Sequence, residues 1–347
     1  MIESEAMLVV GPSWVGDMVM AQSLYQLLQA QGPDAPIDVL APSWSLPLLA
    51  RMPEVRQGIE LPIRHGELAL SERRRLGKSL RGRYGRAIVL PRSLKSALVP
   101  WFAKIPRRTG FRGEHRYGLI NDMRPFDKAV LDQTVKRFVA LGHAADEPGL
   151  QVIPEPALTI DTAAQPATLE RLGLTGTGKV VALMPGAEYG PAKQWPTEYF
   201  ASLAHKLAAQ DVAVWILGSA KEAALGAAIA DGADHPAVRN LSGETELVEA
   251  VDLLGRADVA VSNDSGLMHI AAAVGTHVIA IYGSSTPALT PPLTNNASVH
   301  YLALDCSPCF KRECPLGHLD CLRGIDADAV HASVMSALAT AADEGTQ

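Results

Sequence analysis

The segment SNDSGLMHIAAAVG at residues 262–275 has the residue types of a phosphate-binding loop. Asn263, Asp264, Ser265 and Gly266 precede an apolar helical pattern, and the free N–H groups at a helix start suit a phosphate. Ordinary capping by Asp264 or Ser265 is the competing interpretation. Because a carboxylate repels a diphosphate, Asp264 is expected to cap the helix or to accept a hydrogen bond from a hydroxyl group.

A second loop, PGAEYGPAKQWP at residues 185–196, carries a single cation, Lys193. A lysine at this place can neutralise the charge that develops on a departing diphosphate. The alternative is that Lys193 is simply exposed. Trp195 is expected to pack into the protein, and His269, one turn into the helix of the first loop, is expected to be packed or hydrogen-bonded rather than catalytic.

A third loop, GPSWVGD at residues 11–17, follows the first predicted strand and ends on Asp17. An acidic residue at this position is unusual for a phosphate site, so Asp17 is the candidate general base of the first half. The alternative, a first-turn carboxylate that complements the helix dipole, is at least as common.

All four cysteines fall within CSPCFKRECPLGHLDC, at Cys306, Cys309, Cys314 and Cys321, with His318 among them. This spacing offers enough soft ligands for zinc, and four or five protein ligands would close the site to catalysis. A redox-sensitive pair is the alternative. The cluster therefore predicts a structural clasp, with or without a metal.

Alternating strand and helix patterns carry these loops. In the first half, strands are predicted at 7–10, 37–40 and 87–91, and helices at 18–30 and 96–102. A proline-rich linker is predicted at 148–166. In the second half, strands are predicted at 180–184, 212–218, 238–241, 258–262 and 277–283, and helices at 197–208, 220–230 and 245–255.

This alternation predicts an α/β fold of two doubly wound, Rossmann-like domains, residues 1–160 and 161–347. The last helix opens at Asp326 and is free to pack back on the first domain. Ligands are expected in a cleft between the domains, outside the carboxyl ends of the strands.

Charge is distributed unevenly along the chain. The net charge is −6, yet residues 64–116 hold 15 Lys and Arg against 3 Asp and Glu. A solvated basic surface, an anionic acceptor and an anionic membrane surface all fit this segment. Nucleic acid fits less well, because the segment has few aromatic residues and no recognisable binding motif.

Several classes of protein are disfavoured by what the chain lacks. No G-x-G-x-x-G follows the first strand, which argues against a nicotinamide enzyme, and no cofactor is expected. The start MIESEAMLVV does not resemble a secretory signal, and no apolar run reaches the roughly 18 residues of a membrane span. A cytoplasmic protein is therefore expected.

Taken together, the loops resemble the heptosyltransferases of lipopolysaccharide core assembly, glycosyltransferase family 9. The matching pieces lie in order along nearly the whole chain, at 11–30, 51–55, 93–122, 185–196, 241–245 and 262–275. The resemblance implies a GT-B fold, two Rossmann-like domains facing an interdomain cleft. It also implies an inverting, metal-independent transfer of L-glycero-D-manno-heptose from ADP-heptose onto the first heptose of the inner core on Kdo-lipid A.

The resemblance assigns roles to individual residues. Asp17 matches the family's base, Lys193 its phosphate-binding lysine, and Glu222 resembles its ribose-contacting acid, although Lys221 makes that register uncertain. The other donor-binding residues implied are Asn263, Asp264, Ser265, Gly266 and His269. A phosphorylated, lipid-anchored acceptor at the inner face of the cytoplasmic membrane would be held by the basic segment, with Arg92, Lys95, Arg112 and Arg116 as its contacts.

The sequence also departs from related patterns. The enzyme that adds the first heptose has hydroxyl residues just before the lysine, where Glu188 and Tyr189 stand here, and this favours transfer of the second heptose. The cysteine cluster occurs in only some relatives, so it cannot be required for transfer. The alternatives are first-heptose transfer, a related transferase with another nucleotide sugar, a sugar-nucleotide epimerase, and a non-catalytic binder of anionic glycolipid.

Overall fold

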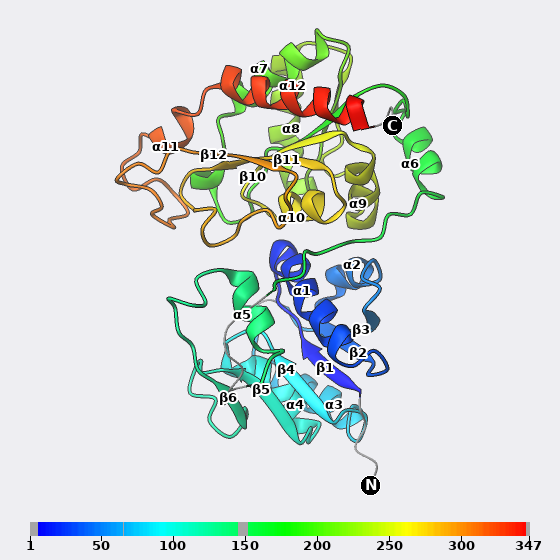
Figure 1. Cartoon of the computed structure of the whole chain (residues 1–347), viewed down its shortest axis with the longest axis vertical. Coiled ribbons are helices and arrows are strands. Elements are labelled where there is room, and N and C mark those ends of the chain that lie inside the picture. Colours follow the sequence, from blue (N-terminus) through cyan, green and yellow to red (C-terminus); the bar gives the residue numbers. More distant parts are fainter. Residues whose placement is uncertain (1–5, 65, 145–151, 345–347) are drawn as a thin grey trace. The chain divides into compact units, whose positions relative to one another are not determined.

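The computed structural model describes residues 6–64, 66–144 and 152–344 (Figure 1). Its contacts divide the chain into two compact units, Met1–Pro156 and Ala157–Gln347. The first part of the predicted linker, 148–151, and the first five residues lie outside the described residues. Among the described residues, no helix combines the length and the apolar character that a bilayer crossing requires.

The N-terminal unit is built on six parallel strands in the order β3-β2-β1-β4-β5-β6. The strands are β1 (Met7–Val10), β2 (Ile37–Ala41), β3 (Val55–Glu60), β4 (Arg86–Val89), β5 (Arg107–Phe111) and β6 (Asp122–Arg124). The helices are α1 (Val15–Gln31), α2 (Leu46–Leu49), α3 (Leu70–Ser79), α4 (Leu98–Phe102) and α5 (Thr134–Ala140), with short turns η1 (Ser43–Ser45) and η2 (Leu94–Ala97).

The C-terminal unit repeats this plan with the order β12-β11-β10-β7-β8-β9. Its strands are β7 (Val180–Met184), β8 (Ala213–Ile216), β9 (Val238–Asn240), β10 (Val259–Asn263), β11 (His277–Tyr282) and β12 (Ala297–Tyr301). Its helices are α6 (Gln165–Arg171), α7 (Thr197–Ala208), α8 (Ala223–Ala233), α9 (Leu247–Arg256), α10 (Gly266–Ala273), α11 (Asp320–Arg323) and α12 (Ala327–Glu344), with turns η3 (Pro191–Lys193) and η4 (Ala220–Glu222).

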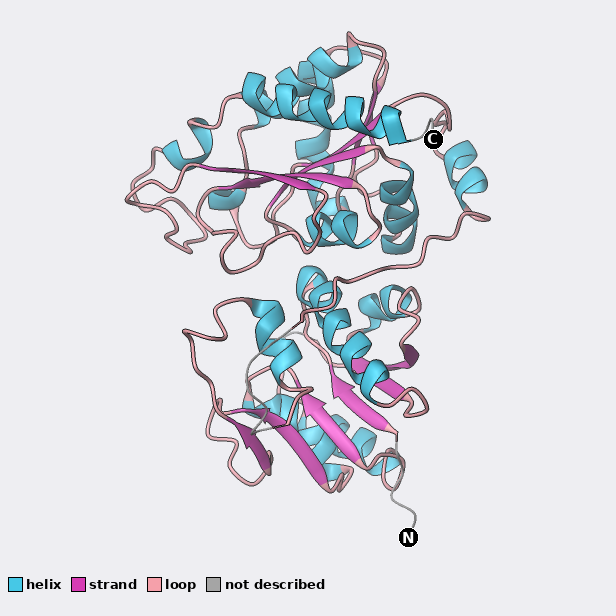
Figure 2. Ribbon diagram, viewed as in Figure 1, coloured by secondary structure: helices cyan, strands magenta, loops and turns pink. Residues whose placement is uncertain are grey.

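Helices lie on both faces of each sheet, and this explains the residue types of the strands (Figure 2). The central strands β7 and β10 are buried along their whole length. A strand covered on both faces is apolar throughout rather than alternating. The last helix, α12, packs on α7 and against β10 and β11 of its own unit.

The predicted pair of parallel, doubly wound domains is confirmed, with some elements added. Strands β3, β5, β6 and β12 were not predicted, because residues along them are partly exposed and no apolar run marks them. Helix α1 begins at Val15, three residues earlier than predicted. Asp17 therefore lies inside the first turn of this helix.

Each sheet has one place where the chain order reverses, and the candidate residues follow the strands that meet there. In the N-terminal unit the neighbours are β1 and β4, and in the C-terminal unit they are β7 and β10. Connections leave these neighbours toward opposite sides, so their carboxyl ends leave room for a ligand. The loop of Asp17 follows β1, and the loops of Lys193 and Asp264 follow β7 and β10.

A buried carboxylate ties three strands of the N-terminal sheet together. Asp38 of β2 is fully buried and accepts hydrogen bonds from Arg56 of β3 at 2.8 and 2.6 Å, from Gln57 at 2.8 Å and from the Tyr84 hydroxyl before β4. Burial alone would raise the pKa of Asp38, but these hydrogen bonds outweigh it and hold the pKa below its ordinary value.

We expect the Asp38→Ala variant to lose about 1.5–3 kcal/mol of stability, the range for hydrogen bonds to a charged group. Arg56 is half exposed and stays solvated, which limits the loss. Because the folded-state pKa is lowered, this stabilisation is present above the unfolded pKa of about 3.9 and disappears as the pH falls through the folded value. Urea unfolding at pH 7 and at lower pH measures it, and Asp34→Ala, at an exposed position, is the control.

Candidate functional site

An ion pair joins the two central loops of the C-terminal unit. Lys193 Nζ donates to Asp264 Oδ2 at 2.5 Å, and the side chains are only 18% and 5% exposed. Thr290 Oγ1 lies 3.4 Å from the other carboxylate oxygen. Lys193 is therefore held at the point where β7 and β10 separate, instead of being simply exposed.

The side-chain amide of Asn263 links the same two loops. Asn263, fully buried at the end of β10, donates through Nδ2 to the Pro185 carbonyl at 2.6 Å and accepts from the Trp195 N–H at 3.0 Å. Trp195 is buried, as predicted, and donates through its indole N–H to the Ile325 carbonyl. Asn263 thus sets the distance between the loops of Lys193 and Asp264.

The start of α10 is open, as an anion site requires. The helix begins at Gly266, and Ser265 and Gly266 are partly exposed. The side chain of Ser265, the N-cap residue, makes no capping hydrogen bond to the helix. The carboxylate of Asp264 faces Lys193 instead, so the capping interpretation does not hold for either residue.

His269 is packed into the protein, as predicted. Its side chain is 4% exposed, and among the described residues Nδ1 has no hydrogen-bond partner. Burial lowers the pKa of His269 to about 4, with a smaller opposing effect of Asp264 and a lowering effect of Lys193. The imidazole is therefore neutral at physiological pH.

Glu222 lies at the end of η4, after β8, and faces the loop of Lys193. Its Oε2 accepts from the Ser219 N–H at 2.7 Å and from the Ser219 hydroxyl at 2.9 Å. A Cβ on Gly186 would lie 1.6 Å from Glu222 Oε1, so a larger residue there would displace this carboxylate from its position. The neighbouring Lys221 contacts the same loop, because its Nζ pairs with Glu188 Oε1 at 2.9 Å.

Three serines that the sequence did not single out lie at the same edge of the sheet. Ser242 follows β9, and Ser284 and Ser285 follow β11. Among the described residues their buried hydroxyls have no hydrogen-bond partner. Ser242 Oγ and Glu222 Oε2 both lie next to Gly218, and the Ser284 N–H donates to the carbonyl of Ala192, the neighbour of Lys193, at 3.4 Å. Because buried polar groups are normally satisfied, these hydroxyls are candidates for contact with a polar ligand. No local signal in the sequence distinguishes these serines from ordinary loop residues.

The N-terminal unit holds Asp17 near arginines. Asp17 is partly exposed in the first turn of α1. The charges of Arg92 and Asp17 act on the guanidinium of Arg137 in α5. The guanidinium groups of Arg92 and Arg137 lie 4.5 and 5.6 Å from the ring centre of Phe126. A carboxylate and two cations thus share one neighbourhood at the carboxyl end of this sheet.

The predicted acceptor contacts differ in their access to solvent. Arg92 and Arg112 are exposed and Lys95 is partly exposed. Arg92 Nε donates to the Arg112 carbonyl at 3.3 Å, which joins the loops after β4 and β5. These three side chains can reach an anionic molecule.

Arg116 cannot play the part predicted for it. It is 1% exposed, and its guanidinium donates to the carbonyls of Phe111 and Pro91 at 2.6 Å. Burial lowers its pKa to about 10. Because the side chain has no surface to offer, Arg116 organises the loops around β4 and β5 instead of binding the acceptor.

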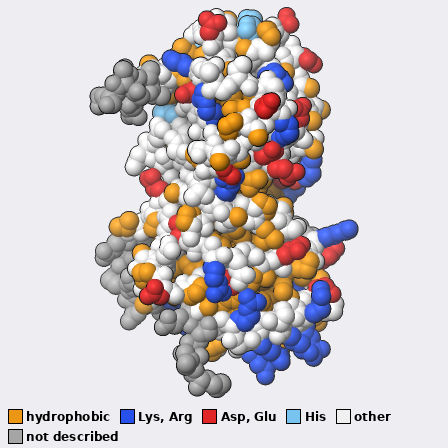
Figure 3. All heavy atoms as spheres, turned by 90° about the vertical axis from the view of Figure 1, so that its right-hand side faces the viewer, with side chains coloured by type: hydrophobic (Ala, Val, Ile, Leu, Met, Phe, Trp, Pro, Cys, Tyr) orange, Lys and Arg blue, Asp and Glu red, His pale blue; other side chains and the backbone are white. Residues whose placement is uncertain are grey.

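The basic segment, residues 64–116, likewise contains both buried and exposed cations. Arg73 is buried and donates to the Leu68 carbonyl, and Arg86 donates to the Leu141 carbonyl. Many of the others remain at the surface, where Lys and Arg side chains gather over part of the N-terminal unit (Figure 3). Part of the positive charge is therefore structural, and the rest is free to meet an anion.

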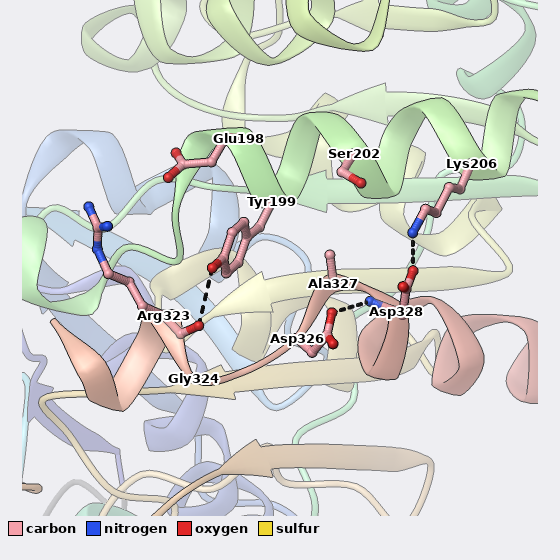
Figure 4. A pocket seen from close by; sticks show the side chains of 9 residues that line it. All are labelled: Glu198, Tyr199, Ser202, Lys206, Arg323, Gly324, Asp326, Ala327 and Asp328. Atoms are coloured by element: carbon pink, nitrogen blue, oxygen red, sulfur yellow. Dashed lines mark hydrogen bonds and ion pairs between the residues drawn. The ribbon is translucent and has the colours of Figure 1, made fainter.

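A separate hollow of about 560 Å³ opens between α7 and the start of α12 (Figure 4). Two contacts between its lining residues are Lys206 with Asp328, an ion pair, and the Tyr199 hydroxyl, which donates to the Arg323 carbonyl at 3.3 Å. No predicted site residue lines it. The hollow is therefore distinct from the loops of Lys193 and Asp264.

Comparison with known proteins supports the assignment of these loops to a glycosyltransferase. The family model "Glycosyltransferase family 9 (heptosyltransferase)" matches residues 73–320. The chain belongs to glycosyltransferase family 9. It is 49% identical to lipooligosaccharide heptosyltransferase 2 of Haemophilus influenzae, over 84% of this chain and 87% of the relative.

Two further matches agree with this family. Lipopolysaccharide heptosyltransferase 2 of Escherichia coli K12 is 48% identical, over 84% of this chain and 86% of the relative. The solved structure of E. coli ADP-heptose LPS heptosyltransferase II matches with a TM-score of 0.88 and 42% identity, covering 96% of this chain and 99% of that one. The predicted family and the GT-B fold are confirmed.

The pH dependence of stability tests the placement of His269. Because its folded pKa lies below the unfolded value of about 6.5, the unfolded chain binds the proton first, and stability falls as the pH drops from about 6.5 to about 4. We expect the His269→Gln variant to lose this part of the acid dependence in urea unfolding. The His115→Gln variant, at an exposed position, is the control. An unchanged pH profile for His269→Gln would contradict the placement.

Proposed function

We propose that this chain transfers L-glycero-D-manno-heptose from ADP-heptose onto the first heptose of the lipopolysaccharide inner core. The observation that carries the proposal is the convergence of Lys193, Asp264 and the start of α10 at one switch point. This convergence occurs in a chain almost half identical to curated heptosyltransferases 2. The first-heptose, epimerase and binding-protein alternatives have no comparable support.

Different residues bind different parts of ADP-heptose. Lys193 and the backbone N–H groups at Ser265 and Gly266 bind the diphosphate, where the charge of the leaving group grows. Asp264 orients Lys193 and accepts from a hydroxyl of the sugar. Glu222 accepts from the ribose, and the orphaned hydroxyls of the three serines complete the polar lining.

Transfer proceeds as a single displacement with inversion at the anomeric carbon. The acceptor hydroxyl oxygen forms a bond to C1 of the heptose while the bond from C1 to the β-phosphate oxygen breaks. Asp17 removes the hydroxyl proton, and ADP leaves with its charge neutralised by Lys193. Aspartate and lysine perform these two tasks without a cofactor.

The positive charge on the N-terminal unit is suited to an anionic acceptor and to an anionic membrane surface. Arg92, Lys95 and Arg112 bind the anionic inner core. Helix α3 contacts α4 and carries the exposed cations Arg74, Arg75 and Lys78, while Trp101 of α4 is 45% exposed. Cations beside an exposed tryptophan suit an anionic lipid surface, so we place the enzyme in the cytoplasm, in peripheral contact with the inner face of the cytoplasmic membrane.

The Asp17→Asn variant tests the base. The amide cannot accept the proton, so kcat is expected to fall about 10²- to 10⁴-fold while binding of ADP stays unchanged. Acceptor-dependent ADP release from ADP-heptose measures transfer, and Asp34→Asn on the same unit is the control. Transfer at the normal rate by Asp17→Asn would exclude this role.

The Lys193→Ala variant tests stabilisation of the leaving group. We expect kcat to fall about 10²- to 10³-fold, as for loss of one transition-state contact. The change also leaves the buried carboxylate of Asp264 unpaired, which lowers stability. The double variant Lys193→Ala/Asp264→Asn removes that charge, so it should recover stability without recovering transfer.

The control for Lys193→Ala is Lys206→Ala, on α7 of the same unit and outside the donor loops. A double variant that regains transfer together with stability would show that Lys193 acts only on folding. Thermal unfolding and ADP release, measured on the same preparations, separate these outcomes.

A further inference from the structure

The cysteine loop has limited apolar packing, which includes the contacts of Leu304 and Leu319 with the core of the C-terminal unit. The segment between β12 and α11, residues 302–319, has no helix or strand of its own, and it exceeds the roughly 12–15 residues of ordinary loops (Figure 1). Three of its large apolar side chains, Leu302, Phe310 and Leu316, are 41%, 44% and 62% exposed. A loop that exposes its apolar residues needs another means of support.

The four cysteines of this segment gather around one place. They line one small cavity of about 20 Å³, together with His318, and none of the four forms a disulfide. Cys321 is buried, Cys309 and Cys314 are partly exposed, and Cys306 is exposed. A cavity of this size holds one water molecule or one ion.

The backbone between Cys314 and Cys321 is held by local hydrogen bonds. The Gly317 N–H donates to the Cys314 carbonyl at 3.2 Å, and the Leu322 N–H donates to the Leu319 carbonyl at 2.9 Å. His318 takes part in the same turn, because its Nδ1 accepts from the Asp320 N–H at 3.0 Å.

The same loop supports the donor loop of Lys193. The Ala192 N–H donates to the Arg312 carbonyl at 3.0 Å, and the Phe310 N–H donates to the Ser284 carbonyl at 2.7 Å. The Tyr189 hydroxyl donates to the Phe310 carbonyl at 2.8 Å. Ala192 and Ser284 also line the cysteine cavity, so a change in the loop is transmitted to residues next to Lys193.

We propose that Cys306, Cys309, Cys314 and Cys321 bind one zinc ion as a closed, tetrahedral site, and that this ion fixes the 302–319 loop against the loop of Lys193. As the described side chains stand, no three His, Cys, Asp or Glu residues form a group that could hold a metal ion. Binding therefore turns the thiol side chains into the cavity, and each gives its proton to solvent as its Zn–S bond forms.

Metal analysis of the full-length protein tests the site directly. The protein is purified in reducing buffer without a chelator or a metal-binding tag, and its zinc content is measured by mass spectrometry. We expect about one zinc per chain, and nearly complete loss in Cys314→Ser and Cys321→Ser. The matched control His318→Ala keeps the metal. A protein that stays free of zinc after incubation with Zn²⁺, or that holds two disulfides instead, overturns the proposal.

A second measurement does not depend on the folding of the cysteine variants. The natural chain is stripped of zinc with a chelator under native conditions and loaded with Co²⁺. Four thiolate ligands predict intense charge-transfer and tetrahedral visible bands, and a lower thermal midpoint for the stripped protein. A Co²⁺ spectrum without thiolate bands overturns the assignment of ligands.

The link to Lys193 rests on the proposed function and has its own readout. Removal of zinc should weaken ADP binding roughly tenfold, about 1.4 kcal/mol, in calorimetric titration, and Zn²⁺ should restore it. Unchanged ADP affinity overturns the positioning role. The metal content is measured without substrates, so its result is independent of whether the chain transfers heptose.

Discussion

The ion pair between Lys193 and Asp264 is the contact on which the proposed chemistry of the C-terminal unit depends. It joins the loops after β7 and β10, two neighbouring strands whose connections leave toward opposite sides. Asn263 fixes the same two loops through the Pro185 carbonyl and the Trp195 N–H. Since the pair is largely buried, Lys193 cannot move freely, and its charge is aimed before any donor arrives.

Burial decides what the charged residues of this chain can do. The charged groups of Arg116 and Asp38 form hydrogen bonds that hold strands and loops together. Arg92 and Arg112, at the ends of neighbouring strands, keep theirs available to solvent. The proposed acceptor surface is therefore a part of the basic segment, and the other part builds the scaffold beneath it.

The position of the Lys193 loop also depends on the cysteine loop, residues 302–319. Its backbone meets Ala192 and Ser284, and its four cysteines share one cavity. The proposed zinc ion adds to the limited apolar packing that Leu304 and Leu319 give the loop. The donor site is then supported from the sheet by Asn263 and from the loop by a metal.

The sequence by itself determined the two parallel sheets, the family and the loops that carry Asp17, Lys193 and Asp264. Buried strands and amphipathic helices leave periodic signals, and the loops between them carry their own motifs. Partly exposed strands such as β12 left no such signal. Only the tertiary structure decided that Lys193 pairs with Asp264, that Arg116 is buried and that three serine hydroxyls have no partner within the described part of the chain. Those facts depend on contacts between segments far apart in the chain, and local residue patterns do not encode them.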